Sequence, residues 1–259
     1  INKIFKKSMS LLKKILKIIL PKFIIVFLKK KYEDYSFSKL KNLSNYNIFK
    51  KIYEEKIWTP ENKKKNFAYY SGYGSHHEGF SKPYVNKVSE FLNSFDKKQN
   101  ILELGCGDFF VSSKLVHLSN NFIACDVFKE LIELNKKKFN NLKVDFRVLD
   151  MTKDDLPKAD ICIVRCVLQH LSNEMILKFI KNAENKFKFL LVTEHYPSTE
   201  KIIPNLNIIT GPSIRLNHNS AVDLSEPPFN LKCCEKKDLC RVTVKSISGY
   251  LRTQLYRFY

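Results

Sequence analysis

A glycine turn preceded by a carboxylate is the part of this sequence whose residue types and spacing best suit binding chemistry. Residues 101–109 read Ile-Leu-Glu-Leu-Gly-Cys-Gly-Asp-Phe. The apolar run at its start predicts a strand that is buried on both faces, and Gly105 and Gly107 allow the backbone to turn sharply against a ligand. A nicotinamide dinucleotide site needs a third glycine three places after the second, but Phe110 occupies that place. The spacing therefore argues against a nicotinamide dinucleotide.

Two further carboxylates follow the turn at the spacing of consecutive strand ends. Residues 122–126 form a second apolar run that ends at Asp126, nineteen positions after Gly107, which is about one helix and one strand of a βαβ unit. A carboxylate there can accept hydrogen bonds from both ribose hydroxyls of an adenosine. Residues 144–151 alternate like a strand and end at Asp150-Met151. A lone aspartate is most often a helix cap or a surface residue, but three acids in series favour a binding site.

The order of these elements resembles the class I S-adenosylmethionine-dependent methyltransferases. The Glu-x-Gly-x-Gly turn is similar to their motif I, residues 159–171 resemble their fourth strand with its Val-Leu-x-His-Leu continuation, and residues 188–195 resemble their fifth. The resemblance implies S-adenosyl-L-methionine as cofactor and S-adenosyl-L-homocysteine as product, with Asp150 at the adenine amino group and Met151 on the ring. The cofactor-binding residues that it implies are Glu103, Gly105, Cys106, Gly107, Asp126, Val127, Asp150, Met151 and Arg165. One departure is Phe109, which stands where many family members carry a third glycine.

Five short motifs outside the cofactor turn resemble a bacterial subgroup of small stand-alone methyltransferases. They lie at residues 71–76, 167–172, 193–197, 211–215 and 227–231, and the resemblance extends from about Trp58 to the C-terminus. This subgroup resembles the methyltransferases of surface-polysaccharide modification clusters. The resemblance therefore implies methylation of a small metabolite or of a surface-glycan (capsule) substituent. A phosphate-type group is one candidate for the methylated substituent. We favour oxygen as the acceptor atom.

Five polar residues are candidates for the acceptor side of the site. In an open α/β sheet, ligands bind beyond the C-terminal ends of the strands, which places Arg165, Glu194 and His195 near the expected site of methyl transfer. His195 is the first candidate for a general base because histidine titrates near neutrality. Arg165 and Arg215 can position an anionic acceptor bidentately. His76 and Arg215 lie in segments where the resembled family builds its acceptor lid.

Each of these residues also has a structural interpretation. Arg165 could be the buried ion-pair partner of Glu194, and His76 could hold a turn through a hydrogen bond. His170, in Val-Leu-Gln-His-Leu, is more readily a residue that braces the start of a helix than a proton carrier. His117 and His218 have no motif around them and are expected at the surface.

The formal net charge of +19 is concentrated at the start of the chain. Residues 1–31 contain ten lysines and no acidic residue, which leaves +9 for the other 228 residues. Apolar residues recur at helical spacing between residues 11 and 19, but lysines interrupt them too often for a membrane span. The segment predicts a basic amphipathic helix that lies on an anionic membrane surface, or one that packs on a partner protein or on the enzyme's own flank.

The cysteines indicate a reducing compartment. The chain has seven of them and no Cys-x-x-Cys pair, so no zinc-site spacing is present and no metal is expected. Free thiols in such number are typical of the cytoplasm. We therefore predict a cytoplasmic protein, located at the inner face of the membrane if the basic segment binds lipid.

The order of predicted elements gives an α/β fold. Strands alternate with helices expected at 110–119, 128–140 and 172–184, which predicts a Rossmann-like, mostly parallel, doubly wound sheet. Two strand-like runs near 230–236 and 241–258 are expected to form the C-terminal antiparallel hairpin of the resembled family's seven-stranded sheet. The expected parts are the basic segment 1–31, a helical lead-in and acceptor-side lid at 32–95, and the methyltransferase domain at 96–259, with an insertion at 196–228 over the active site.

The sequence also suggests two other functions besides a small-molecule methyltransferase. The positive charge favours an RNA methyltransferase, but the fourth strand lacks the Asn/Asp-Pro-Pro-aromatic motif of base-amino methylases and most of the excess charge lies in residues 1–31. Nucleic acid is therefore the less favoured partner. The other rival is a non-catalytic adaptor that keeps the fold and docks through its basic segment. The intact set of Glu103, Gly105, Gly107 and Asp126 argues against this adaptor.

Overall fold

The computed structural model describes residues 38–199, 202–244 and 248–259. Residues 42–259 form one compact unit, and residues 1–41 form another. Of the second unit only residues 38–41 are described, and they make a turn in which the Lys41 N–H donates to the Ser38 carbonyl at 3.2 Å. The predicted amphipathic helix in residues 1–31 lies outside the described residues. None of the helices in the described ranges has the length and apolar character needed to cross a membrane.

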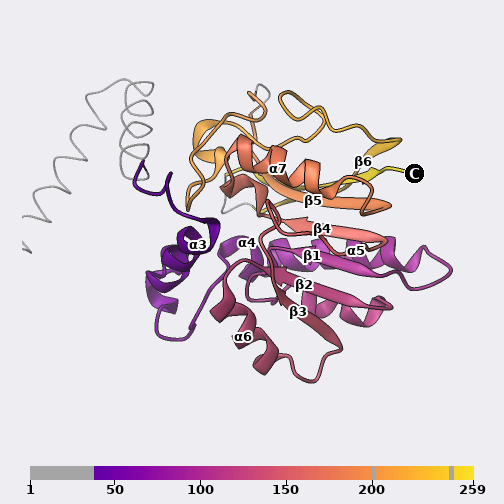
Figure 1. Cartoon of the computed structure of the whole chain (residues 1–259), viewed down its shortest axis with the longest axis horizontal. Helices are drawn as coiled ribbons and strands as arrows, with labels where there is room; N and C mark the ends of the chain where they lie inside the picture. Colours follow the sequence, from indigo (N-terminus) through magenta and orange to yellow (C-terminus); the bar gives the residue numbers. More distant parts are fainter. Residues whose placement is uncertain (1–37, 200–201, 245–247) are drawn as a thin grey trace, which may run out of the picture. The chain divides into compact units, whose positions relative to one another are not determined.

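A seven-stranded mixed sheet forms the centre of the larger unit (Figure 1). Its strands are β1 (Ile101–Leu104), β2 (Phe122–Asp126), β3 (Val144–Val148), β4 (Ile161–Arg165), β5 (Phe189–Tyr196), β6 (Glu235–Thr243) and β7 (Tyr250–Arg257). The spatial order is β3-β2-β1-β4-β5-β7-β6. The first five strands pair in parallel, while β7 runs antiparallel to both β5 and β6. The predicted sheet and its C-terminal hairpin are confirmed, although the hairpin strands lie at Glu235–Thr243 and Tyr250–Arg257 rather than near 230–236 and 241–258.

Alternating side chains divide the core into two layers, one on each face of the sheet. On β4, Cys162 and Val164 belong to one hydrophobic cluster, while Ile161 and Ile163 belong to the other. The first layer is completed by α7 (Asn173–Ala183) and by part of the segment 222–231. The second is completed by α5 (Glu78–Asn93) and by Ile132 of α6 (Lys129–Lys138). Because neighbouring residues on a strand point to opposite faces, the face of each polar residue at a strand end follows from its position.

Local side-chain hydrogen bonds fix the helix boundaries. Helix α3 (Asn45–Glu54) begins after Ser44, whose hydroxyl accepts from the Asn47 N–H, and α7 begins after Ser172, which accepts from the Met175 N–H. Serine is a favoured N-cap because its oxygen satisfies an amide that has no partner within the helix. Short helices are α4 (Tyr73–His76), η1 (Glu61–Lys63), η4 (Leu168–His170) and η5 (Arg215–His218).

The helix predicted at residues 110–119 is wrong. Two 3₁₀ turns occupy this stretch, η2 (Ser112–Lys114) and η3 (Val116–Leu118). The Ser112 hydroxyl donates to Glu103, and the Ser113 hydroxyl donates to the Phe110 carbonyl at 3.1 Å. Serine side chains that bond in this way compete with the regular backbone ladder of an α-helix. The spacing of apolar residues, on which the helix prediction rested, carries no information about these serine hydrogen bonds.

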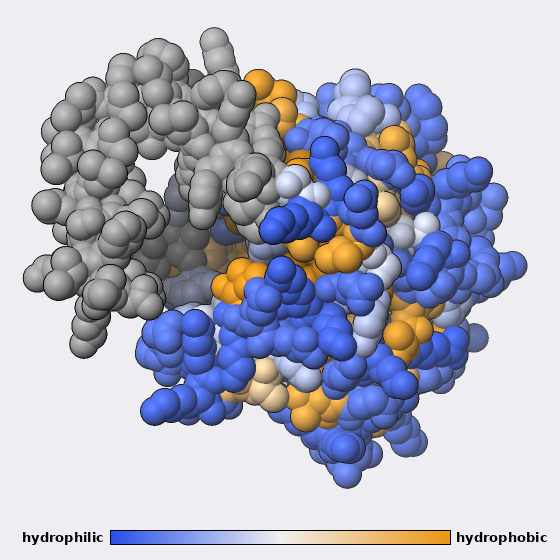
Figure 2. All heavy atoms as spheres, turned by 60° about the vertical axis from the view of Figure 1, so that its left-hand side comes forward, coloured by the Kyte–Doolittle hydropathy of each residue, from blue (hydrophilic) through white to orange (hydrophobic). Residues whose placement is uncertain are grey.

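Hydrophilic residues dominate the face of the molecule that Figure 2 shows, and the apolar groups on it are small and separate. The large hydrophobic side chains exposed in the described residues include Leu43, Ile57 and Tyr73. Scattered apolar residues of this kind are normal on a protein surface. The view therefore gives no reason to infer a broad apolar docking surface on the visible, described part of this face.

Candidate active site

The glycine turn after β1 forms one wall of the site. Gly105 and Gly107 have φ angles of 74° and 57°, in the left-handed region that glycine adopts without strain. A Cβ atom on Gly105 would collide with the Val167 side chain, and one on Gly107 would collide with the Ser71 hydroxyl. Both positions therefore require glycine for backbone conformation and for space.

Phe109 has a backbone conformation that glycine adopts more readily. Its φ angle is 57°, a conformation that costs energy for a residue with a bulky side chain. Its buried ring makes edge contacts with Phe122, Phe139 and Phe146 at centroid distances of 5.6, 5.3 and 4.9 Å. Aromatic contacts of this geometry offset part of that cost.

Asp126, at the end of β2, holds the glycine turn and faces the pocket. Its Oδ2 accepts from the Gly107 N–H and its Oδ1 accepts from the Phe128 N–H, both at 3.0 Å. Burial raises the pKa of this carboxyl, and the backbone donors oppose that effect. Each carboxylate oxygen has more than one lone pair, so Asp126 keeps acceptor capacity for ribose hydroxyls.

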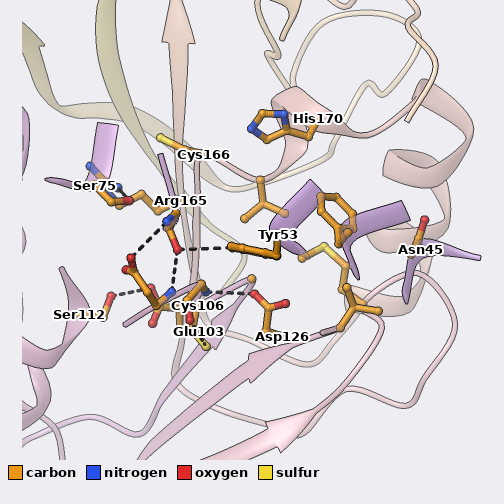
Figure 3. Close-up of a pocket in the computed structure, with 18 of the residues that line it drawn as sticks. Asn45, Tyr53, Ser75, Glu103, Cys106, Ser112, Asp126, Arg165, Cys166 and His170 are labelled. Carbon is orange, nitrogen blue, oxygen red and sulfur yellow. Dashed lines mark hydrogen bonds between the residues drawn. The ribbon is translucent and has the colours of Figure 1, made fainter. Parts of the chain in front are cut away.

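Glu103 on β1 and Arg165 on β4 both line this pocket with a polar atom left unpaired (Figure 3). Glu103 Oε1 accepts from the Ser112 hydroxyl, but Oε2 is buried without a partner among the described residues. Arg165 donates to the Gly74 carbonyl at 2.7 Å and to Ser75 Oγ at 3.2 Å, and its Nε has no partner in the same ranges. Burial raises the pKa of Glu103 to about 8.

These two unpaired groups fit the amino-acid end of S-adenosylmethionine. Buried polar atoms without a hydrogen bond are uncommon in proteins, and each costs free energy that a ligand can recover. An ammonium group would satisfy Glu103 Oε2, and a carboxylate would satisfy Arg165 Nε. The residues present therefore suit the cofactor that the sequence predicts.

The segment around α4 is fastened over the glycine turn. The Ser71 N–H donates to Asp108 Oδ2 at 3.1 Å, and the Asp108 N–H donates to Ser71 Oγ at 2.6 Å. His76 Nε2 binds the same Asp108 carboxylate, and its ring stacks with Tyr70 and Phe110 at centroid distances of 4.3 and 4.6 Å. His76 is not among the residues that line the pocket. Its contacts fit the structural interpretation, a hydrogen bond that holds a turn.

These elements surround a cavity of about 890 Å³, its open mouth included. All nine residues predicted to bind the cofactor line it. Lining residues that were not predicted as site residues include Asn45, Phe49, Tyr53, Trp58, Ser75, Cys166 and His170. The signal for three of them was a spacing of four residues, which puts Asn45, Phe49 and Tyr53 on one face of a helix.

Glu194 and His195 point to opposite faces of the sheet, and neither lines the pocket. The His195 ring lies 6.0 Å from the ring of Phe80 on α5, and its buried Nε2 has no partner among the described residues. Burial lowers the pKa of His195, and the backbone of Ser248 opposes that effect. Glu194 faces the α7 side instead, where Oε1 accepts from the Leu168 N–H at 3.0 Å. The shared position near the methyl group that we predicted for this pair is not found.

Arg215 is fully buried and also lies outside the pocket lining. Its guanidinium donates to the carbonyls of Leu206, Leu168 and Leu171 at 2.9, 2.9 and 2.7 Å, and to Asn173 Oδ1 at 2.8 Å. Acceptors within the protein therefore bind all three nitrogens of the Arg215 guanidinium. This geometry indicates a structural role for Arg215 rather than the acceptor contact expected from the sequence.

His170 lines the pocket, whereas His195, the general base predicted from the sequence, does not. Figure 3 shows its ring across the pocket from Asp126 and Cys106. Its Nδ1 lies 3.2 Å from the Ser213 carbonyl oxygen, which can only accept, so Nδ1 carries the proton and Nε2 keeps its lone pair. The Trp58 ring lies 4.7 Å from the His170 ring. Burial lowers the pKa of His170 to about 4, so the ring is neutral near pH 7.

The sheet order, with its C-terminal antiparallel hairpin, defines the class I methyltransferase fold. Residues 101–188 match the family model described as a methyltransferase domain. The chain therefore carries a methyltransferase domain of the S-adenosylmethionine-dependent class, as predicted from the sequence. Among curated proteins, none matches the chain.

Solved structures share the fold at low sequence identity. The N-methyltransferase NodS from Bradyrhizobium japonicum WM9, in complex with S-adenosyl-L-homocysteine, is 12% identical with a TM-score of 0.54, and the match covers 78% of this chain and 95% of that chain. The N-terminal domain of EvdMO1, crystallised in the presence of S-adenosyl-L-homocysteine and D-fucose, is 15% identical with a TM-score of 0.50, covering 73% and 85%. TehB from Haemophilus influenzae is 17% identical with a TM-score of 0.47, and the match covers 68% of this chain and 62% of the TehB chain.

Proposed function

We propose that the protein transfers a methyl group from S-adenosylmethionine to an oxygen atom of a small metabolite or of a surface-glycan (capsule) substituent. The observation that carries this proposal is the presence of His170 and Arg165 in the lining of the same pocket. One is a neutral ring whose Nε2 can accept a proton, and the other is the one Lys or Arg side chain among the described lining residues. Bound S-adenosylmethionine supplies an electrophilic methyl group, so the protein needs chiefly to align the acceptor and exclude water.

For a neutral hydroxyl acceptor, His170 Nε2 is the group that receives the proton. The Ser213 carbonyl fixes the tautomer, and the Gln169 amide nitrogen, 3.4 Å from Nε2, is at the long limit of a hydrogen bond. An acceptor hydroxyl can therefore replace that weak contact. His195, the base first predicted, does not enter this proposal because it does not line the pocket.

For an anionic acceptor, such as a phosphate-type group, no base is required. Arg165 then positions the acceptor through charge-assisted hydrogen bonds. Its guanidinium is already oriented by Gly74 and Ser75 of the lid and lies 4.8 Å over the Tyr84 ring. A fixed guanidinium loses less conformational freedom on binding than a mobile one.

The test is a methylation screen with the purified full chain and S-adenosylmethionine. Separate reactions contain sugar phosphates, nucleotide sugars, hydroxylated metabolites, capsular oligosaccharide or RNA, and mass spectrometry detects S-adenosylhomocysteine and the methylated product. Oxygen methylation of a small or glycan acceptor supports the proposal. A nitrogen-methylated product or methylated RNA overturns it. Failure to bind S-adenosylhomocysteine in calorimetry favours the non-catalytic adaptor.

The basic segment 1–31 supports a cytoplasmic location at the inner face of a membrane as part of this proposal. Its ten lysines would be attracted to anionic lipid, and its apolar residues at helical spacing would enter the interface. The test is co-sedimentation of the full chain and a 32–259 chain with phosphatidylserine vesicles. Loss of binding on deletion supports lipid docking. Equal sedimentation of both chains contradicts it and favours a protein partner or the enzyme's own flank.

A further inference from the structure

We propose that Asn45, on α3 and outside the matched methyltransferase domain, makes the pocket specific for adenine, both by orienting Asp150 and through its own Oδ1. The inference rests on the S-adenosylmethionine cofactor of the proposed function. Asn45 lies 105 positions from Asp150 in the chain, yet the two side chains are hydrogen bonded and both line the pocket. The adenine end of the site is thus completed by the lead-in helix rather than by the methyltransferase domain alone.

The Asn45 side chain fixes the orientation of the Asp150 carboxylate. Asn45 Nδ2 lies 3.1 Å from both carboxylate oxygens of Asp150 and 3.1 Å from Thr152 Oγ1. Thr152 in turn donates to Asp150 Oδ1 through its hydroxyl at 2.7 Å and through its N–H at 3.0 Å. Since each side chain in this group holds another, the carboxylate cannot rotate without breaking several hydrogen bonds.

The hydrogen-bond pattern leaves acceptors, not donors, for the ligand. Among the described residues, Asp150 Oδ1 receives three donors, whereas Oδ2 receives the Asn45 amide and lies 3.9 Å from the Lys153 ammonium. Because carboxylate oxygens only accept, Asn45 must turn its NH₂ group toward them. Its own Oδ1 then has no donor within the described ranges. The two remaining acceptors suit the two N–H groups of the adenine amino substituent.

A base with an oxygen in place of that amino group is rejected by the same arrangement. The 6-oxo group of hypoxanthine is an acceptor and would face Asp150 Oδ2 and Asn45 Oδ1 without a proton between them. A site built to hydrogen-bond one substituent discriminates strongly against an analogue that leaves its polar groups unpaired. We expect the wild-type chain to prefer the adenine ligand by roughly tenfold or more.

Helix α3 is held in place by contacts that do not involve Asn45. The Tyr46 hydroxyl donates to Glu130 at 2.9 Å, and the Tyr53 ring stacks on Phe128 at a centroid distance of 5.4 Å. Glu130 lies in α6 and Phe128 directly precedes it, and α6 packs beside β2 and β3. Substitution of Asn45 should therefore leave the helix in position and change the adenine contact selectively.

The experiment compares S-adenosyl-L-homocysteine with S-inosyl-L-homocysteine, its 6-oxo analogue, by calorimetry on the full chain. The variants are Asn45→Ala and the isosteric Asn45→Asp, whose carboxylate would repel Asp150. The matched control is Asn47→Ala, an exposed asparagine on the same helix. Circular dichroism establishes that each variant is folded.

We expect both Asn45 variants to lose most of the preference for the adenine ligand, and Asn47→Ala to keep it. If an Asn45 variant binds both ligands more weakly but in the wild-type ratio, Asn45 only supports the fold and the inference is overturned. If either variant keeps wild-type affinities for both, it is also overturned. A wild-type chain that binds neither ligand instead contradicts the proposed function, so the two failures are distinct.

Discussion

Glu194 and Arg215 bind the same turn of the chain, Glu194 through its N–H groups and Arg215 through its carbonyl groups. The Glu194 carboxylate accepts from the N–H groups of Leu168 and Gln169 at 3.0 and 2.9 Å. The Arg215 guanidinium donates to the carbonyls of Leu168 and Leu171 at 2.9 and 2.7 Å. This turn contains η4 and carries His170 into the pocket. Two charges predicted to contact the acceptor instead position the segment that faces it.

Arg215→Met should lower the free energy of unfolding by about 3–5 kcal/mol, because it leaves buried carbonyls unpaired and removes the charge that attracts Glu194. Urea denaturation measures this. The matched control is Arg257→Met, an exposed arginine, which should change stability by about 0.5 kcal/mol or less. Should Arg215→Met keep full stability and lose only methyl transfer, the direct catalytic role expected from the sequence would return.

The sequence predicted the cofactor side of the site because its contacts follow from strand order. In a parallel sheet the ends of β1, β2 and β4 meet at one edge, so Gly107 and Asp126 had to be neighbours. It could not tell which face of β5 carries Glu194 and which carries His195, since alternation gives opposite faces without saying which one borders the pocket. The contact of Asn45 with Asp150 could not be predicted from the sequence, because the two residues lie 105 positions apart in the chain.

Gly107→Ala should abolish measurable S-adenosylhomocysteine binding in calorimetry. The added methyl group would collide with Ser71 Oγ and would also impose a φ of 57° on an alanine. Gly72→Ala separates these causes, because Gly72 also has a positive φ, 89°, but has open space around its Cβ position. We expect Gly72→Ala to lose about 1–2 kcal/mol of stability while retaining binding. Equal affinities for wild type and Gly107→Ala would show that the lid does not close on the turn in solution.

Asp126→Ala should weaken S-adenosylhomocysteine binding by about 1–3 kcal/mol through the loss of the ribose hydrogen bonds. It also removes the acceptor for the Gly107 N–H, so the turn itself loses a support. Asp126→Asn, which keeps one acceptor oxygen, should show a smaller loss. Asp96→Ala, at an exposed aspartate, is the control. Calorimetry that finds Asp126→Ala as tight as wild type would remove Asp126 from the cofactor site.

The His170 ring should make the stability of the fold depend on pH between its folded-chain pKa and the ordinary value for histidine. Its pKa is about 4 in the folded chain because of burial, against an ordinary value of 6.5. Between these values the unfolded chain binds a proton that the folded chain does not, so stability falls as the pH drops from 6.5 toward 4. The full effect is about 3 kcal/mol, and above pH 6.5 it vanishes.

Urea unfolding at intervals from pH 7.5 to 4.5 measures this dependence. His170→Asn, whose amide can still donate to the Ser213 carbonyl, should be less stable than the wild type at pH 7. It should also reduce the slope of the unfolding free energy against pH by up to the amount that corresponds to one proton. His117→Gln, at an exposed histidine, should leave the slope unchanged. Identical slopes for the wild type and His170→Asn would mean that burial does not lower the pKa of His170 in the folded chain. The expected pH dependence would then be wrong, and the case for Nε2 as the proton acceptor would rest only on the tautomer that the Ser213 carbonyl fixes.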